Sequence, residues 1–263
     1  MKMRFIPGLI SLFLGVVLSS SSKASYLLLN PVEDRPSIIT ETFTFSSNGT
    51  KYKGKIFIPA SYETHTNLPA IYLVDFAEQD YKVAKDEFEK VVAGVRQIQG
   101  FDALVVTLEE HQDIDAKPQS FLEYYDVFKN MSSYVDSIYT KNTSRTFIGR
   151  GSEAGIVLMT LFLENSEVAV FESFIVTDPA PSFTSTVINM IENEDVPKSS
   201  TDKKLHFSFS TSNDYDLCAT LITLLEKAQY PWLRFETKVY TDSNYENTYP
   251  VSFAAGLEYI FME

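Results

Sequence analysis

The sequence predicts an α/β protein with a doubly wound, mostly parallel sheet that begins with an antiparallel hairpin. Two patterns support this. From about residue 70 onward, short apolar runs alternate with longer segments whose apolar residues recur at helical spacing. Before that point, two alternating apolar and polar segments flank Asn48-Gly49, a dipeptide typical of tight hairpin turns. No repeat, low-complexity segment or linker divides the chain, so we expect one domain over residues 25–263.

The predicted elements follow the chain in order. The hairpin strands cover Ser37–Phe45 and Lys51–Pro59, where apolar and polar residues alternate. Ala70–Phe76 and Asp102–Glu109 are almost unbroken apolar segments, as expected of strands buried on both faces of a parallel sheet. We expect the remaining strands at 145–149, 171–177, 204–210 and 233–241, and the helices at 80–99, 121–139, 153–164, 184–193, 216–229 and 250–261.

The N-terminal segment 1–24 has the pattern of an export signal. Lys2 and Arg4 precede the apolar stretch Phe5–Leu18, and Ser22-Lys23-Ala24 forms a small-x-small cleavage site. The apolar stretch is short for a membrane-spanning helix, although a retained anchor is the alternative reading. We therefore expect a secreted, extracytoplasmic protein that has no membrane contact after the signal peptide is removed.

The chain is strongly acidic, with 35 Asp and Glu against 22 Lys and Arg. Cleavage after residue 24 would remove three positive charges and take the net charge from −13 to −16. Such a charge repels nucleic acid and anionic lipid surfaces, so we expect neither as a partner. A well-solvated surface explains the charge most simply, and cationic partners would also fit it.

Cysteine and sequon content are compatible with export. Cys218 is the single cysteine, so no internal disulfide forms, and its apolar helical surroundings predict a buried thiol. The triplets that begin at Asn48, Asn130 and Asn142 match the acceptor pattern for N-linked glycans, which predicts a glycoprotein in a eukaryotic secretory pathway.

Four stretches in the right order resemble the esterase branch of the α/β-hydrolases, which includes enterochelin esterases and S-formylglutathione hydrolase. They are LPAIYLVD at 68–75, YVDSIY at 134–139, RTFIG at 145–149 and GLEYIF at 256–261. Together they extend over nearly all of the mature chain. The resemblance implies an α/β-hydrolase fold, with its site at the turn after strand 145–149. Activity does not follow from the fold alone.

In that family the turn reads Gly-x-Ser-x-Gly, and the serine is the nucleophile. Counting from Gly149 places Gly151 at the serine position and Glu153 at that of the second glycine. Gly151 suits the unusual backbone angles of the turn and offers no oxygen. A shift of one residue would make Ser152 the nucleophile, with Arg150 at a position that favours glycine.

The resemblance also locates the other triad members. The family's histidine follows the last strand, where this chain has Tyr245, whose ordinary pKa of about 10 prevents it from acting as a base near neutral pH. His206 falls inside a predicted strand and is expected to be structural. Asp214 or Asp216 stands where the family's acid lies, although either could instead cap the next helix.

Other residues could also belong to the site. The oxyanion-hole region of the family corresponds to Asp75 and Phe76, where a glycine is usual. His111 lies near two aspartates in a polar loop, which is too little to define a metal site, and we expect neither metal nor cofactor. His65 is expected at the surface.

These observations predict a secreted esterase-like protein with a degenerate catalytic triad, which acts by binding a small-molecule ester or acyl ligand or a protein partner. The alternative is an active carboxylic-ester hydrolase that uses Ser152. A carbohydrate-associated protein is a third hypothesis, based only on the aromatic content of 15 Tyr and 20 Phe.

Overall fold

A computed structural model describes residues 39–74, 87–109, 120–164, 169–194, 196 and 201–262. All of them belong to one compact unit, Pro36–Glu263. The predicted signal peptide lies outside the described residues, as do Asp75, Phe76 and His111.

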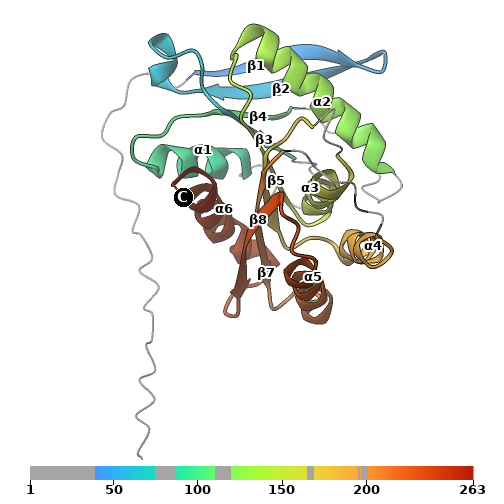
Figure 1. The fold of residues 1–263 in the computed structure, drawn as a ribbon. Helices are drawn as coiled ribbons and strands as arrows, with labels where there is room; N and C mark the ends of the chain where they lie inside the picture. The colour runs from blue at the N-terminus through green and yellow to red at the C-terminus, as the bar shows by residue number, and fades with distance from the viewer. Residues whose placement is uncertain are drawn as a thin grey trace, which may run out of the picture. The chain divides into compact units, whose positions relative to one another are not determined.

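Strands and helices alternate along this unit as the sequence predicts (Figure 1). The strands are β1 (Ile39–Ser47), β2 (Thr50–Ile58), β3 (Ala70–Leu73), β4 (Leu104–Leu108), β5 (Arg145–Arg150), β6 (Ser173–Thr177), β7 (Lys203–Ser210) and β8 (Leu233–Tyr240). The α-helices are α1 (Glu87–Gln97), α2 (Phe121–Ile138), α3 (Ser152–Leu163), α4 (Pro181–Glu192), α5 (Tyr215–Ala228) and α6 (Tyr245–Met262), and a short 3-10 helix covers Ala60–Glu63.

The strands form one eight-stranded sheet in the order β1-β2-β4-β3-β5-β6-β7-β8. β1 pairs with β2 and β2 with β4 in antiparallel fashion, and every later pair is parallel. The hairpin turn has positive φ at both Asn48 (49°) and Gly49 (80°), which matches the right-handed twist of its strands. The predicted fold class is confirmed.

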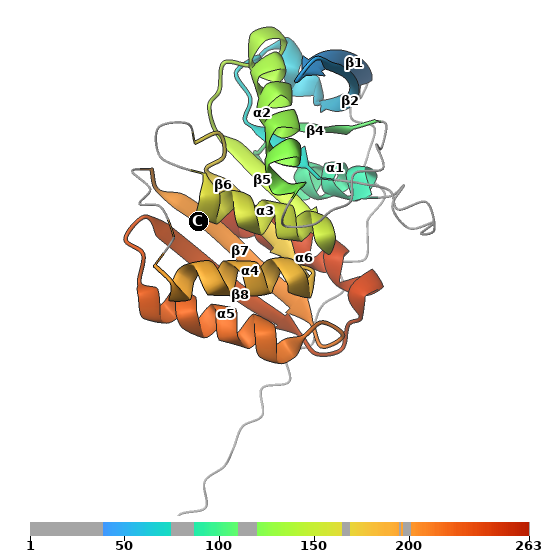
Figure 2. The ribbon, with the colours of Figure 1, turned by 90° about the vertical axis from the view of Figure 1, so that its right-hand side faces the viewer.

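Helices cover both faces of the sheet (Figure 2). One apolar cluster combines α2, α3, α4 and α5 with one face, and a second combines α1 and α6 with the other. The predicted buried thiol is confirmed, because Cys218 on α5 is about 1% exposed within the first cluster. Among the helices of the described residues, none is long and apolar enough to cross a membrane.

One predicted boundary was wrong in a way that affects the site. We expected the last helix to begin at Pro250, with Tyr245 in the preceding loop, but α6 begins at Tyr245. Asn244 supplies the reason, because its Oδ1 accepts a hydrogen bond from the N–H of Asn247 at 3.1 Å. This side-chain cap starts the helix before the proline, which then lies within it.

Candidate active site

The turn between β5 and α3 has the shape of an elbow, and Gly151 forms its apex. Gly151 has φ 64° and ψ −125°, a combination that side chains strongly disfavour. Its N–H donates to the carbonyl of Thr177 at 3.0 Å, and its own carbonyl accepts from Ala180 at 2.9 Å. The apex is therefore tied to the end of β6 and to the start of α4.

Gly149 establishes the alignment of this turn with the family motif. A Cβ atom at Gly149 would lie 2.6 Å from the backbone carbon of Glu153, closer than any real contact of this kind. Position 149 therefore requires glycine, as the first position of Gly-x-Ser-x-Gly does. Glu153 makes the approach with its backbone, which explains how a glutamate can stand at the motif's second glycine. In this alignment Gly151 falls at the position of the motif's serine.

Ser152, the alternative nucleophile, is the first residue of α3 and lies one position beyond the apex. Its side chain is half-buried, and the residue follows the apex, which is the position that the nucleophile occupies in this fold.

Neither described histidine lies at the turn. His206 is confirmed as structural: it is fully buried in the middle of β7, and its Nδ1 lies 2.8 Å from Oε2 of Glu236 on β8. Burial lowers the pKa of His206, while the Glu236 carboxylate, which can accept a hydrogen bond from the ring, opposes that shift. His65 is exposed next to the 3-10 helix, with Nδ1 at 2.8 Å from the hydroxyl of Thr64, as expected of a surface residue.

The acids named from the sequence are both exposed at the start of α5. Asp214 is its N-cap, and Oδ1 accepts a hydrogen bond from the N–H of Leu217 at 3.1 Å. Asp216 lies in the first turn of the same helix. The capping role foreseen for these residues is thus present at Asp214. Tyr245, which the resemblance predicts at the histidine's place, begins α6.

Sequence reasoning missed Asp178, a buried carboxylate at the carboxyl end of β6. Its Oδ1 accepts from both the N–H (2.6 Å) and the hydroxyl (3.0 Å) of Ser210, at the end of β7. Burial raises the pKa of Asp178, and hydrogen bonds from Ser210, Asn213 and Thr248 partly oppose the shift. Asp178 follows Thr177, whose carbonyl accepts the hydrogen bond from the apex glycine. The signal in the sequence that could have identified it is a lone aspartate directly after a buried strand.

An ion pair lies on the other side of the apex. Arg150, the last residue of β5, has Nη2 at 2.5 Å from Oε1 of Glu87 at the start of α1, and both side chains are at most 10% exposed. The guanidinium also lies 4.6 Å from the ring centroid of Tyr249 on α6, whose hydroxyl accepts a hydrogen bond from Lys90. Burial raises the pKa of Glu87, and Arg150 opposes that shift.

The carboxyl edge of the sheet thus presents two carboxylates and two cations around a glycine apex. Within the described residues no group of three His, Cys, Asp or Glu side chains could hold a metal ion. The oxyanion-hole candidates Asp75 and Phe76, and the loop that contains His111, lie outside the described residues.

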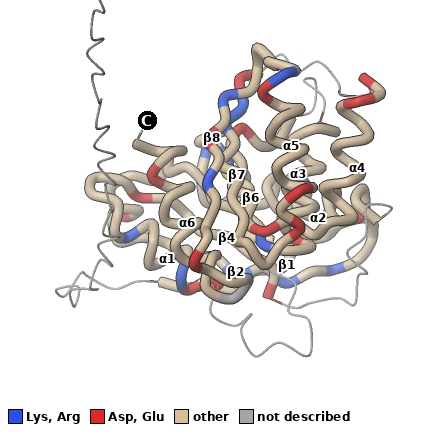
Figure 3. The backbone as a smooth tube through the Cα atoms, turned by 90° about the horizontal axis from the view of Figure 1, so that it is seen from below, with Lys and Arg blue, Asp and Glu red and all other residues tan. Residues whose placement is uncertain are grey.

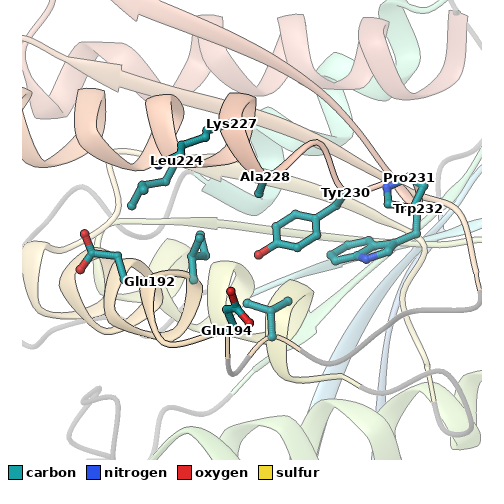
Figure 4. A pocket seen from close by; sticks show the side chains of 10 residues that line it. Glu192, Glu194, Leu224, Lys227, Ala228, Tyr230, Pro231 and Trp232 are labelled. Carbon is teal, nitrogen blue, oxygen red and sulfur yellow. The ribbon is translucent and has the colours of Figure 1, made fainter.

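A groove of about 990 Å³ lies elsewhere, at the amino-terminal edge of the sheet. It is formed by the ends of α4 and α5 and by the segment that precedes β8 (Figure 4). Tyr230 and Trp232 stack in its wall with ring centroids 5.2 Å apart, and the hydroxyl of Tyr230 points toward the side where Glu194 lies. This groove is separate from the elbow, because α4 runs from the carboxyl edge to the amino edge.

The strand order and the elbow after β5 together define an α/β-hydrolase fold. An IroE-like serine hydrolase from Shewanella oneidensis superposes with a TM-score of 0.70 at 15% identity, over 85% of this chain and 80% of that one. The siderophore hydrolase EstA from Aspergillus nidulans gives 0.68 at 12% identity, over 90% and 98%. The feruloyl esterase module from Clostridium thermocellum, a mutant complexed with sinapinate, gives 0.56 at 12%, over 88% and 89%.

These solved neighbours are esterases and hydrolases, and at such identities the likeness establishes the fold that they share with this chain. No protein-family model matches the sequence, and no curated protein matches it.

Proposed function

We propose that this protein is a catalytically inactive member of the α/β-hydrolase fold that acts by binding. The observation that carries the proposal is the apex of the elbow. Gly151 has the backbone angles of the turn and no side chain, so no oxygen is available there to attack a carbonyl. The family's catalytic base is also replaced, since Tyr245 stands at the place of its histidine.

The ligand that we propose is a small molecule with an ester or acyl group, bound at the carboxyl edge of the sheet. Open α/β sheets collect ligands at this edge, next to the turns that follow the strands. Several neighbours of the same fold hydrolyse siderophores or are feruloyl esterases. Loss of the nucleophile would leave such a ligand bound and intact. A protein partner at the same edge is the other candidate.

We further propose that the protein works outside the cytoplasm, after removal of residues 1–24, as a glycoprotein where the host adds N-linked glycans. The charged, apolar and small-residue regions of the leader support export. Asn48 lies exposed at the tip of the β1–β2 hairpin, with its Nδ2 donating to Oδ2 of Asp126 at 3.4 Å. N-terminal sequencing of the exported protein tests cleavage, and a chain that still begins at Met1 would contradict it.

Activity is tested by comparing the parent protein with Ser152→Ala. Both are treated with a fluorophosphonate probe and with p-nitrophenyl acetate and other short-chain esters. We expect no covalent labelling and no difference in rate between the two proteins. A weak rate common to both is compatible with inactivity, because sites without a working triad can retain about 10³–10⁴-fold catalysis over water.

The opposite result would identify an active enzyme. If the parent hydrolyses esters at an enzyme-like rate and Ser152→Ala abolishes this, Ser152 is the nucleophile and the proposal is wrong. Reconstruction tests the same argument in reverse. The double variant Gly151→Ser with Tyr245→His should gain hydrolysis that neither single variant has, because nucleophile and base act as a unit.

A further inference from the structure

Among the residues that the structure describes, no strand pairs with the outer edge of β8. β8 is the terminal strand of the sheet and pairs in parallel with β7. The carbonyls of Trp232 and Tyr240 accept hydrogen bonds from β7 and from the residue that follows it, at 2.7 and 3.3 Å. Because backbone groups alternate in direction along a strand, the even-numbered residues face β7. The N–H and C=O groups of Phe235, Thr237 and Val239 therefore point outward.

Charged residues of alternating sign recur along β8, and Figure 3 colours the backbone by the sign of charge. Arg234, Glu236 and Lys238 are exposed on one face of β8. Val239 is about 40% exposed on the other face, where Phe235 is partly buried. Charges on an edge strand usually prevent uncontrolled pairing with other strands. On β8 the charges also distinguish between the few registers in which a second copy of β8 could pair with the first.

We propose that β8 pairs in antiparallel fashion with β8 of a second copy of this chain, with Thr237 opposite Thr237 on the twofold axis. In this register the outward-facing residues oppose one another, as hydrogen bonding across the edge requires. Glu236 then lies opposite Lys238 twice, once on each side of the axis. Phe235 lies opposite Val239, and Arg234 lies opposite Tyr240. Opposite charges and apolar pairs across strands are both stabilising.

The neighbouring registers are unfavourable for specific reasons. An axis at position 236 would place Glu236 opposite itself and Arg234 opposite Lys238, so that every charge meets a like charge. An axis at position 238 would place Lys238 opposite itself. An axis at position 235 would pair Arg234 with Glu236, but only Leu233–Thr237 of β8 could then pair, because Pro231, which has no N–H, would lie opposite Val239. The register with Thr237 on the axis combines opposite charges with the longer run of paired residues, from Arg234 to Tyr240.

The pairing joins two sheets along one strand edge, which is a small interface, so we expect a concentration-dependent dimer. Sedimentation velocity from low-micromolar to submillimolar concentration should show a monomer–dimer equilibrium of the full chain. A protein that remains monomeric over this whole range overturns the proposal.

Charge variants test the register. Lys238→Glu places like charges opposite each other twice and should raise the dimer dissociation constant by about tenfold or more. Lys227→Glu, an equally large change at an exposed position of α5, should leave it unchanged. The double variant Lys238→Glu with Glu236→Lys restores opposite charges and should restore dimerisation. This register is refuted if Lys238→Glu and Lys227→Glu change the dimer dissociation constant equally. It is also refuted if the double variant melts at the same temperature as the parent and still fails to dimerise.

Cross-linking tests the axis directly and does not depend on charge. Thr237→Cys should form a covalent dimer under mild oxidation, because directly opposed residues of paired strands have Cα atoms within disulfide range. Lys238→Cys is the matched control. In this register its two copies are offset by two residues along the strand from direct opposition, and no bridge should form. Efficient cross-linking through position 238 and none through 237 would contradict the proposed axis.

Discussion

Two buried ion pairs lie at opposite edges of the parallel sheet, and they differ in how completely the carboxylate is satisfied. At the amino edge, Glu164 accepts hydrogen bonds from Lys203 (3.1 Å), from the hydroxyl of Tyr125 (2.9 Å) and from the N–H groups of Val170 and Phe171. Both members of this pair are fully buried. At the carboxyl edge, Glu87 pairs with Arg150 beside the elbow.

The two carboxylates therefore lie in different electrostatic surroundings. Glu164 links the end of α3 to α2, to the segment before β6 and to the first residue of β7. Its donors replace the water that burial removed, which is the condition for a stabilising buried pair. Glu87 has a raised pKa because burial outweighs its cations, Arg150 and Lys90. Perturbed groups of this kind concentrate at functional sites.

The largest expected effect is at the amino edge. Lys203→Met removes the cation and leaves the Glu164 carboxylate buried beside an apolar side chain. We expect the free energy of unfolding, measured by urea titration, to fall by about 3–5 kcal/mol. Lys203→Met combined with Glu164→Gln should recover most of this loss, because no charge then remains buried and the amide oxygen can still accept from Tyr125 and Val170. A double variant as unstable as the single one would show that the pair itself is needed.

The next effect concerns the turn at the carboxyl edge. Gly149→Ala forces a methyl group against the backbone of Glu153, which cannot rotate away, and should lower the free energy of unfolding by about 2–3 kcal/mol. Gly100→Ala is the control, since it meets open space and is disfavoured only by its φ of 77°. That variant should lose about 1–2 kcal/mol. Equal losses in the two variants would mean that the elbow is less tightly packed than the geometry indicates.

Arg150→Met should cost less than Lys203→Met, because Lys90 remains near Glu87. We expect a loss of about 1–3 kcal/mol at neutral pH. The loss should depend on pH. The pKa of Glu87 is already raised, so the folded state binds its proton more tightly than the unfolded state does. Stability from this group is present at acidic pH and is lost as pH rises through the folded pKa.

Removing Arg150 raises that pKa further, so the loss should be smaller near pH 5 than near pH 8. Urea titrations of parent and variant at both values provide the check. A loss that is independent of pH would indicate that packing of the Arg150 side chain on Tyr249, and not its charge, is what matters.

The smallest effect is expected at His206. Its lowered pKa means that the folded state favours the neutral ring, so its contribution to stability is present above the unfolded pKa of about 6.5 and is lost as pH falls through the folded value. His206→Gln should remove about 1 kcal/mol or less of the stability change between pH 7 and pH 5. The difference between the stability–pH profiles of the parent and of His206→Gln isolates the contribution of this group. Identical profiles would contradict a lowered pKa of His206.

The course of the backbone could be predicted from local patterns. The alternation of apolar strands and amphipathic helices predicted the eight strands and six α-helices, because the periods of burial differ between strands and helices. Asn48-Gly49 predicted the hairpin, and the glycine pattern at 149–155 predicted the turn after β5. His206 was interpreted correctly as structural, since a position inside a buried strand leaves no route to the edge of the sheet.

The site depended on contacts between residues that are distant in the sequence. Asp178 escaped notice because its significance comes from Ser210 and Thr248, which only the parallel register and the position of α6 bring to it. The start of α6 at Tyr245 depended on the cap formed by Asn244. The sequence left two possible registers for the elbow, and the close packing of Gly149 on Glu153 supports the register with Gly151 at the serine position. Local periodicity thus determined which segments are strands and helices, whereas long-range packing decided which polar groups meet at the carboxyl edge.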